Sequence, residues 1–127
     1  MKRTFSTLSV AAAICFAITP AASALSASQA KACNTLGADL QKRQAKAQKL
    51  AAERLNLLDE VEDAGDAWEN TETLRNFGDA EAAEADANKA TYDSLKRDLL
   101  AKEQTLQNLI ASLNTEVAAY NAKCVKK

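Results

Sequence analysis

Apolar residues recur along the chain at alternating steps of three and four residues, in two long stretches. The first series of such steps runs from Cys33 to Trp68, and the second runs from Asn88 to Cys124. This spacing keeps one narrow stripe of a helix facing a partner helix, as in a coiled coil. The second series has two successive four-residue steps at Leu113, which locally unwind a supercoil. The pattern therefore predicts two long helices that pack along a shared seam.

Three basic residues interrupt this seam, namely Arg43, Arg54 and Lys102. Their aliphatic stems can pack in the seam while their charged ends reach outward, toward Glu53 and Glu103 in the case of Arg54 and Lys102. The predicted seam residues are Cys33, Leu36, Leu40, Arg43, Ala47, Leu50, Arg54, Leu57, Val61, Ala64 and Trp68 in the first stretch, and Asn88, Tyr92, Leu95, Leu99, Lys102, Leu106, Leu109, Leu113, Val117, Tyr120 and Cys124 in the second.

The two series are separated by Asn76-Phe77-Gly78-Asp79. Gly78 can end a helix in the left-handed conformation without a Cβ penalty. Asp79 can accept a hydrogen bond from a free N–H of the following turn, as an N-cap. We therefore expect one helix over about residues 27–76, a turn at 76–79, and a second helix over about residues 80–123.

Two further positions bear on the first helix. Ser26 lies three residues before Gln29, the spacing of a capping box at a helix start. Gly65 weakens a helix interior by about 1 kcal/mol, so a break there is an alternative. The segment from there to Phe77 would then fold back as the short third helix of a three-helix bundle.

Composition supports an all-α chain. The sequence has 3 glycines and 1 proline among 127 residues, and aromatic residues make up 5%. Such a composition favours long helices over sheet, and this length supports one small domain. The sequence therefore predicts a long antiparallel two-helix coiled-coil hairpin.

Folding the chain back at Gly78 brings together seam residues whose numbers add up to 156, such as Leu50 with Leu106. The numbers of Cys33 and Cys124 add up to 157. The turn, the seam and the two cysteines therefore indicate the same register, with the cysteines side by side at the open end of the hairpin.

The chain begins as secretory signal peptides do. Basic residues in Met1–Arg3 precede an apolar run over 8–18, and small residues follow up to Ala24. We expect residues 1–24 to be a signal peptide and residues 25–127 to be the exported protein, most simply in the periplasm, with an extracellular location as the alternative.

Cysteine usage agrees with export. Cys15 leaves with the signal peptide, so Cys33 can pair only with Cys124. In an oxidising compartment this pair is expected to form a disulfide. No histidine and no third cysteine remain for a metal site. We therefore predict a structural disulfide and no metal site.

Charge is concentrated near the expected turn. Residues 59–86 contain eleven acidic residues and one basic residue, for a net charge of −10, whereas residues 25–58 and 87–127 carry +4 and +3. Solvation of the helix surface is one interpretation, and docking of a cationic partner is the other. The candidate acidic tip comprises Asp59, Glu62, Asp63, Asp66, Glu69, Glu72, Glu81, Glu84 and Asp86.

A second candidate surface is apolar and lies off the seam, near the middle of the hairpin. Widening of the hairpin's own seam is one explanation for it. Self-association into a four-helix bundle, or docking of another helix, is the other, and on this basis we predict a homodimer. The residues of this apolar stripe are Ala51, Leu55, Leu58, Leu100 and Ile110.

Catalytic motifs are missing from the sequence. It has no glycine-rich phosphate loop, no nucleophile elbow and no metal-ligand spacing. We therefore expect neither enzymatic activity nor a cofactor. The exported chain is acidic and its lysines are scattered, which disfavours nucleic-acid binding. Lysines at the open end, Lys31 and Lys123 among them, leave contact with an anionic membrane surface open.

In outline the predicted hairpin is similar to the antiparallel coiled-coil hairpins of envelope adaptors and chaperones of Gram-negative bacteria, a likeness of architecture without a shared motif. The sequence favours an exported binding module, chaperone- or adaptor-like, that presents its acidic tip and apolar stripe to another exported or envelope protein. A passive spacer of the cell envelope and an inhibitor of a cationic hydrolase are the alternatives.

Overall fold

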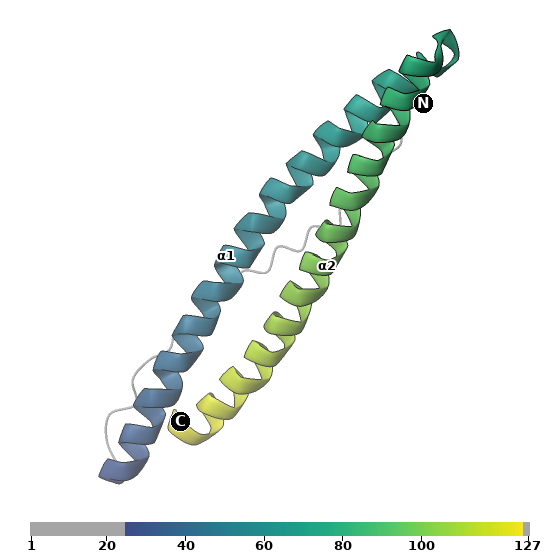
Figure 1. Ribbon diagram of the computed structural model, residues 1–127. Helices are drawn as coiled ribbons and strands as arrows, with labels where there is room; N and C mark the ends of the chain where they lie inside the picture. Colours follow the sequence, from purple (N-terminus) through teal and green to yellow (C-terminus); the bar gives the residue numbers. More distant parts are fainter. Residues whose placement is uncertain (1–24, 126–127) are drawn as a thin grey trace.

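The structure is a computed structural model that describes residues 25–125 and shows two long antiparallel helices lying side by side (Figure 1). Helix α1 spans Ala27–Glu72, a short 3-10 helix η1 spans Arg75–Phe77, and helix α2 spans Asp79–Cys124. Each long helix has 46 residues, so each is about 70 Å long at ~1.5 Å per residue. The predicted two-helix hairpin is confirmed. The signal peptide predicted for residues 1–24 lies outside the described residues.

Helix α1 begins at the predicted cap. The Ser26 hydroxyl oxygen accepts a hydrogen bond from the Gln29 N–H at 3.2 Å, and the Gln29 side-chain oxygen accepts one from the Ser26 N–H at 3.0 Å. This capping box satisfies two N–H groups that the first helical turn leaves free. From there α1 continues without a break through Gly65, so the alternative three-helix bundle is wrong.

The end of α1 differs from the expectation. The helix ends at Glu72 rather than near residue 76, and the chain tightens into η1 through hydrogen bonds from Leu74 N to Thr71 O and from Phe77 N to Leu74 O. A threonine hydroxyl accompanies this end of the helix. The hydroxyl of Thr73 donates to the carbonyl of Asn70 at 2.7 Å. Such side-chain bonds satisfy carbonyls that a helix end leaves free.

The roles predicted for Gly78 and Asp79 are also wrong. Gly78 has φ 175° and ψ 173°, an extended conformation rather than a left-handed one, and it occupies the N-cap position of α2 without a side-chain cap. Asp79 is the first residue of α2, where its negative charge is favourable at the positive end of the helix dipole. An extended residue leads from η1 into α2 with no left-handed residue, so the turn does not require glycine for its backbone conformation.

The seam is confirmed throughout, because all the predicted seam residues are buried or half-buried. Contacts between the helices confirm the register. The Cys33–Cys124 disulfide closes the open end, with 5.7 Å between the two Cα atoms. A Cβ atom built on Gly37 would meet the Tyr120 ring at 3.5 Å, and one built on Gly65 would meet the Tyr92 ring at 3.3 Å. Each glycine of α1 therefore lies against a tyrosine of α2.

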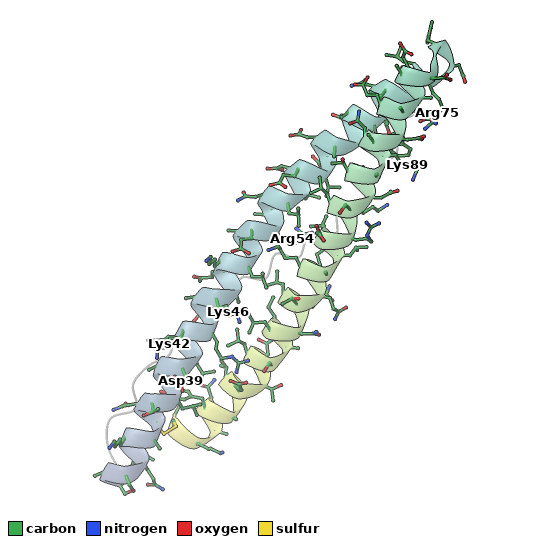
Figure 2. The ribbon with its side chains drawn as sticks, viewed as in Figure 1. Asp39, Lys42, Lys46, Arg54, Arg75 and Lys89 are labelled. Atoms are coloured by element: carbon green, nitrogen blue, oxygen red, sulfur yellow. A yellow bond between two sulfur atoms is a disulfide. The ribbon has the colours of Figure 1, made fainter. Side chains whose placement is uncertain are left out.

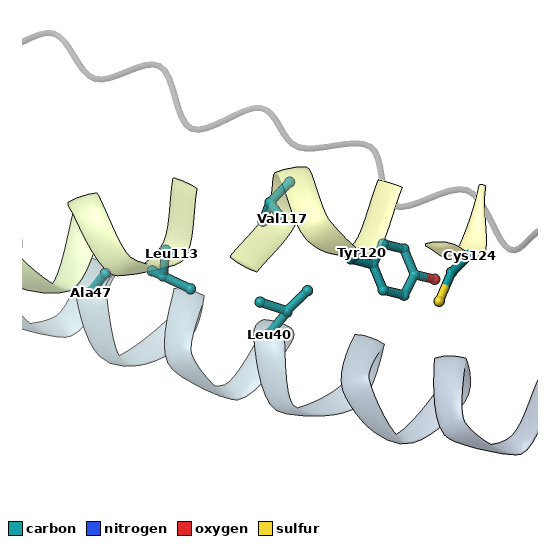
Figure 3. Close-up of a cluster of buried hydrophobic side chains, with 6 residues drawn as sticks. All are labelled: Leu40, Ala47, Leu113, Val117, Tyr120 and Cys124. Atoms are coloured by element: carbon teal, nitrogen blue, oxygen red, sulfur yellow. The ribbon is translucent and has the colours of Figure 1, made fainter. Parts of the chain in front are cut away.

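The best-buried part of the seam lies next to the disulfide. Leu40 is 2% exposed, and it packs in a cluster of buried side chains contributed by both helices (Figure 3). Partly buried apolar side chains surround this cluster. The cluster comprises Leu40, Ala47, Leu113, Val117, Tyr120 and Cys124. The disulfide and the core therefore stabilise the same end of the hairpin.

Candidate functional site

The turn end of the hairpin carries the predicted acidic tip. Eight of its nine carboxylates are exposed to solvent, and Glu81 is half-buried. They lie on the last turns of α1 and the first turns of α2. Because the two helices meet at η1, this arrangement concentrates a net charge of −10 from residues 59–86 at one end of the molecule.

Arg75, labelled in Figure 2, binds two of these carboxylates and stabilises the turn. Its guanidinium donates to Glu72 at 3.0 Å and to Asp86 at 2.6 Å, which connects the end of α1, η1 and the start of α2. The hydrogen bond to Asp86, and then the one to Glu72, raise the pKa of Arg75 above its ordinary value. Within residues 25–125, the other seven carboxylates of the acidic tip form no ion pair, and six of them are exposed to solvent.

Two large apolar side chains project from the turn among these charges. Phe77 is 80% exposed and Leu74 is 48% exposed. From the sequence, Leu74 was expected in the first helix and Phe77 in the turn, and neither was predicted as part of the tip. For Phe77 the signal was present, because turn segments are usually polar and this turn contains a phenylalanine.

An aromatic layer lies directly below the tip. The rings of Trp68 and Tyr92 stack with their centroids 5.5 Å apart and an interplanar angle of 26°. The ammonium of Lys89 lies over the Trp68 ring at 5.4 Å, and that of Lys96 lies over the Tyr92 ring at 5.5 Å. Such cation–π contacts stabilise the charged amines where they lie. The layer joins the two helices just where the core thins toward the turn.

Charged residues connect the two helices along the shaft, as predicted for the basic seam positions. Arg54 donates to Glu103 at 2.9 Å, and Lys102 donates to Glu53 at 2.8 Å. The hydrogen bond from Lys102 lowers the pKa of Glu53 below its ordinary value. Nearer the disulfide, Arg43 donates to Ser112 at 2.9 Å and pairs with Glu116. The hydrogen bond from Arg43, followed by the one from Ser112, lowers the pKa of Glu116.

The predicted apolar stripe is partly open to solvent. Leu55 is 57% exposed and Leu100 is 58% exposed, whereas Ala51, Leu58 and Ile110 are half-buried against the hairpin. Widening of the hairpin's own seam therefore accounts for three of the five residues. Leu55 and Leu100 remain exposed to solvent.

Two chemical properties of the described part of the chain bear on function. Among residues 25–125, no group of three or more cysteine and carboxylate side chains is arranged to hold a metal ion. Neither long helix contains an apolar segment of the length that a bilayer crossing needs.

Comparison of the chain with protein-family models, with curated proteins and with solved structures finds no match. Function is therefore inferred from the exposed surfaces of the hairpin.

Proposed function

We propose that this protein is an exported, non-enzymatic binding module, adaptor- or chaperone-like, that docks its tip onto a cationic site of another exported or envelope protein. The observation that carries the proposal is Phe77, a large apolar side chain 80% exposed at the turn. It lies within the 59–86 segment, whose net charge is −10.

The two features of the tip supply different parts of binding. Exposed carboxylates attract a cationic surface over a distance and accelerate encounter. A phenylalanine that fills an apolar pocket supplies short-range affinity, as buried aromatic anchors do at many interfaces. Arg75 and the Trp68–Tyr92 stack hold the turn in place, which lowers the ordering cost on binding.

Export is part of the proposal. The Cys33–Cys124 disulfide supports it, because structural disulfides persist in oxidising compartments and are rare in reducing ones. The signal-peptide pattern of residues 1–24 supports it from the sequence. Mass spectrometry of the protein recovered from outside the cytoplasm tests this part directly, since a chain beginning at Leu25 is expected.

The tip is tested by site-specific photo-crosslinking in the cells that make the protein. A photoreactive residue replaces Phe77 in one variant and Ser94, an exposed shaft residue, in the matched control. We expect a covalent adduct with one cationic protein from position 77 and not from position 94. The captured protein is then purified for binding measurements. At low salt, Glu69→Gln/Glu84→Gln should bind it more weakly than wild type does. Added salt should weaken the binding of wild type, because it screens the charges of the tip.

The alternatives give different results. A passive spacer gives no adduct from position 77 above the level from position 94, and this outcome would overturn the proposal. An inhibitor of a cationic hydrolase gives an adduct with an enzyme whose activity falls when the hairpin is added. The single tryptophan, Trp68, lies beneath the tip, so its fluorescence reports tip binding in solution.

A further inference from the structure

We propose that two copies of this chain associate through the face that carries Leu55 and Leu100, in an antiparallel arrangement that places the acidic tip of one copy beside the disulfide end of the other. This interface is separate from the tip, and the inference does not depend on the proposed tip function.

Leu55 and Leu100 lie on the same side of the hairpin. Each directly follows a seam residue, Arg54 in α1 and Leu99 in α2. In a right-handed helix the next residue is rotated by about 100°, and because α2 runs opposite to α1, the rotation carries both side chains to one face. The Arg54–Glu103 pair lies on this face, since Glu103 also follows a seam residue.

This face has almost no free charge from the two leucines to the disulfide end of the molecule. On α1, the residues that follow seam positions between 40 and 58 are all amide or apolar, namely Gln41, Gln44, Gln48, Ala51, Leu55 and Leu58. On α2, the corresponding residues from Leu100 onward include Gln107, Ile110 and Asn114, and the one acid among those up to Asn121, Glu103, is paired with Arg54.

The opposite face differs on α1. There the residues that precede seam positions include Asp39, Lys42, Lys46, Lys49 and Glu53, whereas the corresponding residues of α2 from Ala101 to Ala119 are mostly uncharged. Charged, flexible side chains oppose burial because they lose both hydration and conformational freedom. The charges of α1 therefore make the face with Leu55 and Leu100 the better suited of the two to a protein partner.

The distribution of charge along the hairpin favours a second copy as that partner. The disulfide half, residues 25–50 and 106–125, carries a net charge of +4, and the turn half, residues 51–105, carries −9. An antiparallel dimer places each half beside the opposite charge of the other copy, whereas a parallel dimer places the two −9 halves together. Electrostatics therefore selects the antiparallel arrangement.

The position of the two leucines also fits a twofold dimer. Leu55 and Leu100 lie near the middle of their helices. A twofold axis perpendicular to the hairpin at this height places the patch of one copy on the same patch of the other, as an isologous interface requires. The two tips then lie at opposite ends of a four-helix bundle, both free to bind.

The dimer is tested by light scattering on purified, oxidised protein. Leu55→Glu/Leu100→Glu is compared with Asn56→Glu/Ala101→Glu, which adds the same charge at the same height on the opposite, exposed face. We expect wild type and the opposite-face variant to have the mass of two chains at tens of micromolar. The leucine variant should be monomeric, with a dissociation constant raised about a hundredfold or more. Circular dichroism checks that both variants remain helical.

A monomeric wild type at 100 µM, or equal dissociation of both variants, would overturn the proposal. Orientation is measured with spin labels on single added cysteines, Asn56→Cys near mid-shaft and Ala80→Cys near the turn. The antiparallel dimer predicts that the mid-shaft labels, which lie on the outer faces of the bundle, are separated only by the width of the bundle. The turn labels are expected about 60–70 Å apart, given the helix length. Turn labels close together would show a parallel dimer and overturn the stated arrangement.

Discussion

The two ends of this hairpin share one local contact, between a tyrosine and a glycine, in different surroundings. At each end a tyrosine of α2 lies against a glycine of α1, Tyr120 on Gly37 and Tyr92 on Gly65. Tyr120 is 6% exposed and belongs to the core cluster beside the disulfide. Tyr92 is half-buried, stacks on Trp68 and is covered by a lysine.

Charge separates the ends further. The disulfide half carries +4 and the turn half carries −9, and the turn exposes Leu74 and Phe77. A two-helix hairpin buries little surface, so stability concentrated at one end leaves the other end free for surface chemistry. The molecule therefore separates the region that holds it together from the region that we propose binds a partner.

The largest expected effect comes from removing the disulfide. Cys33→Ala/Cys124→Ala should lower the free energy of unfolding by about 4–5 kcal/mol, because the disulfide closes a loop with a sequence separation of 91. Urea unfolding of the variant and of wild type at equal protein concentration measures this loss. In this variant, backbone hydrogen exchange should increase more near Tyr120 than near Tyr92. A larger increase near Tyr92 would contradict the conclusion that the disulfide end holds the hairpin together.

The next effect separates core from tip. Leu40→Ala should cost about 2–4 kcal/mol of stability, because it opens a cavity in the buried cluster. Phe77→Ala should change stability by less than about 0.5 kcal/mol, because its side chain is exposed. Urea midpoints test both changes. A strongly destabilised Phe77→Ala protein would show that the turn end contributes to the fold more than its burial indicates.

A smaller difference is expected between the two glycines. Alanine gains about 1 kcal/mol over glycine in a helix interior. At Gly37 the added Cβ meets Tyr120 at an ordinary 3.5 Å, whereas at Gly65 it meets Tyr92 at a tight 3.3 Å. Gly37→Ala should therefore be more stabilising than Gly65→Ala in thermal unfolding. Equal stabilisation would mean that the Tyr92 ring shifts freely, which would sharpen the contrast with the packed disulfide end.

The smallest expected effect depends on pH. Arg43 and Ser112 lower the pKa of Glu116 in the folded state. A lowered folded-state pKa stabilises the fold above the ordinary glutamate value of 4.5 and loses that contribution as the pH falls through the folded-state value. Wild type should thus be slightly more stable than Glu116→Gln at pH 7, with the difference vanishing as the pH falls below the folded-state pKa of Glu116. A difference that grows toward low pH would contradict the pairing.

Sequence alone determined the architecture, because long packed helices require apolar residues at a regular spacing along the chain. The three-and-four spacing located the seam, and the numbers of Cys33 and Cys124 matched the register that the seam required. The outward reach of Arg54 and Lys102 toward Glu103 and Glu53 followed from their position on the seam. The seam depends on residues repeated over many turns, so one misleading residue cannot change its register.

Tertiary structure decided the details that depend on single residues. The end of α1 at Glu72 and the extended Gly78 could not be predicted, since a local 3-10 turn replaced the conformations that glycine and aspartate usually favour at helix ends. The exposure of Phe77 and the uncovered pair Leu55 and Leu100 also required the fold. A heptad pattern specifies which residues face the partner helix, but only packing in three dimensions determines which of the remaining apolar side chains stay in water.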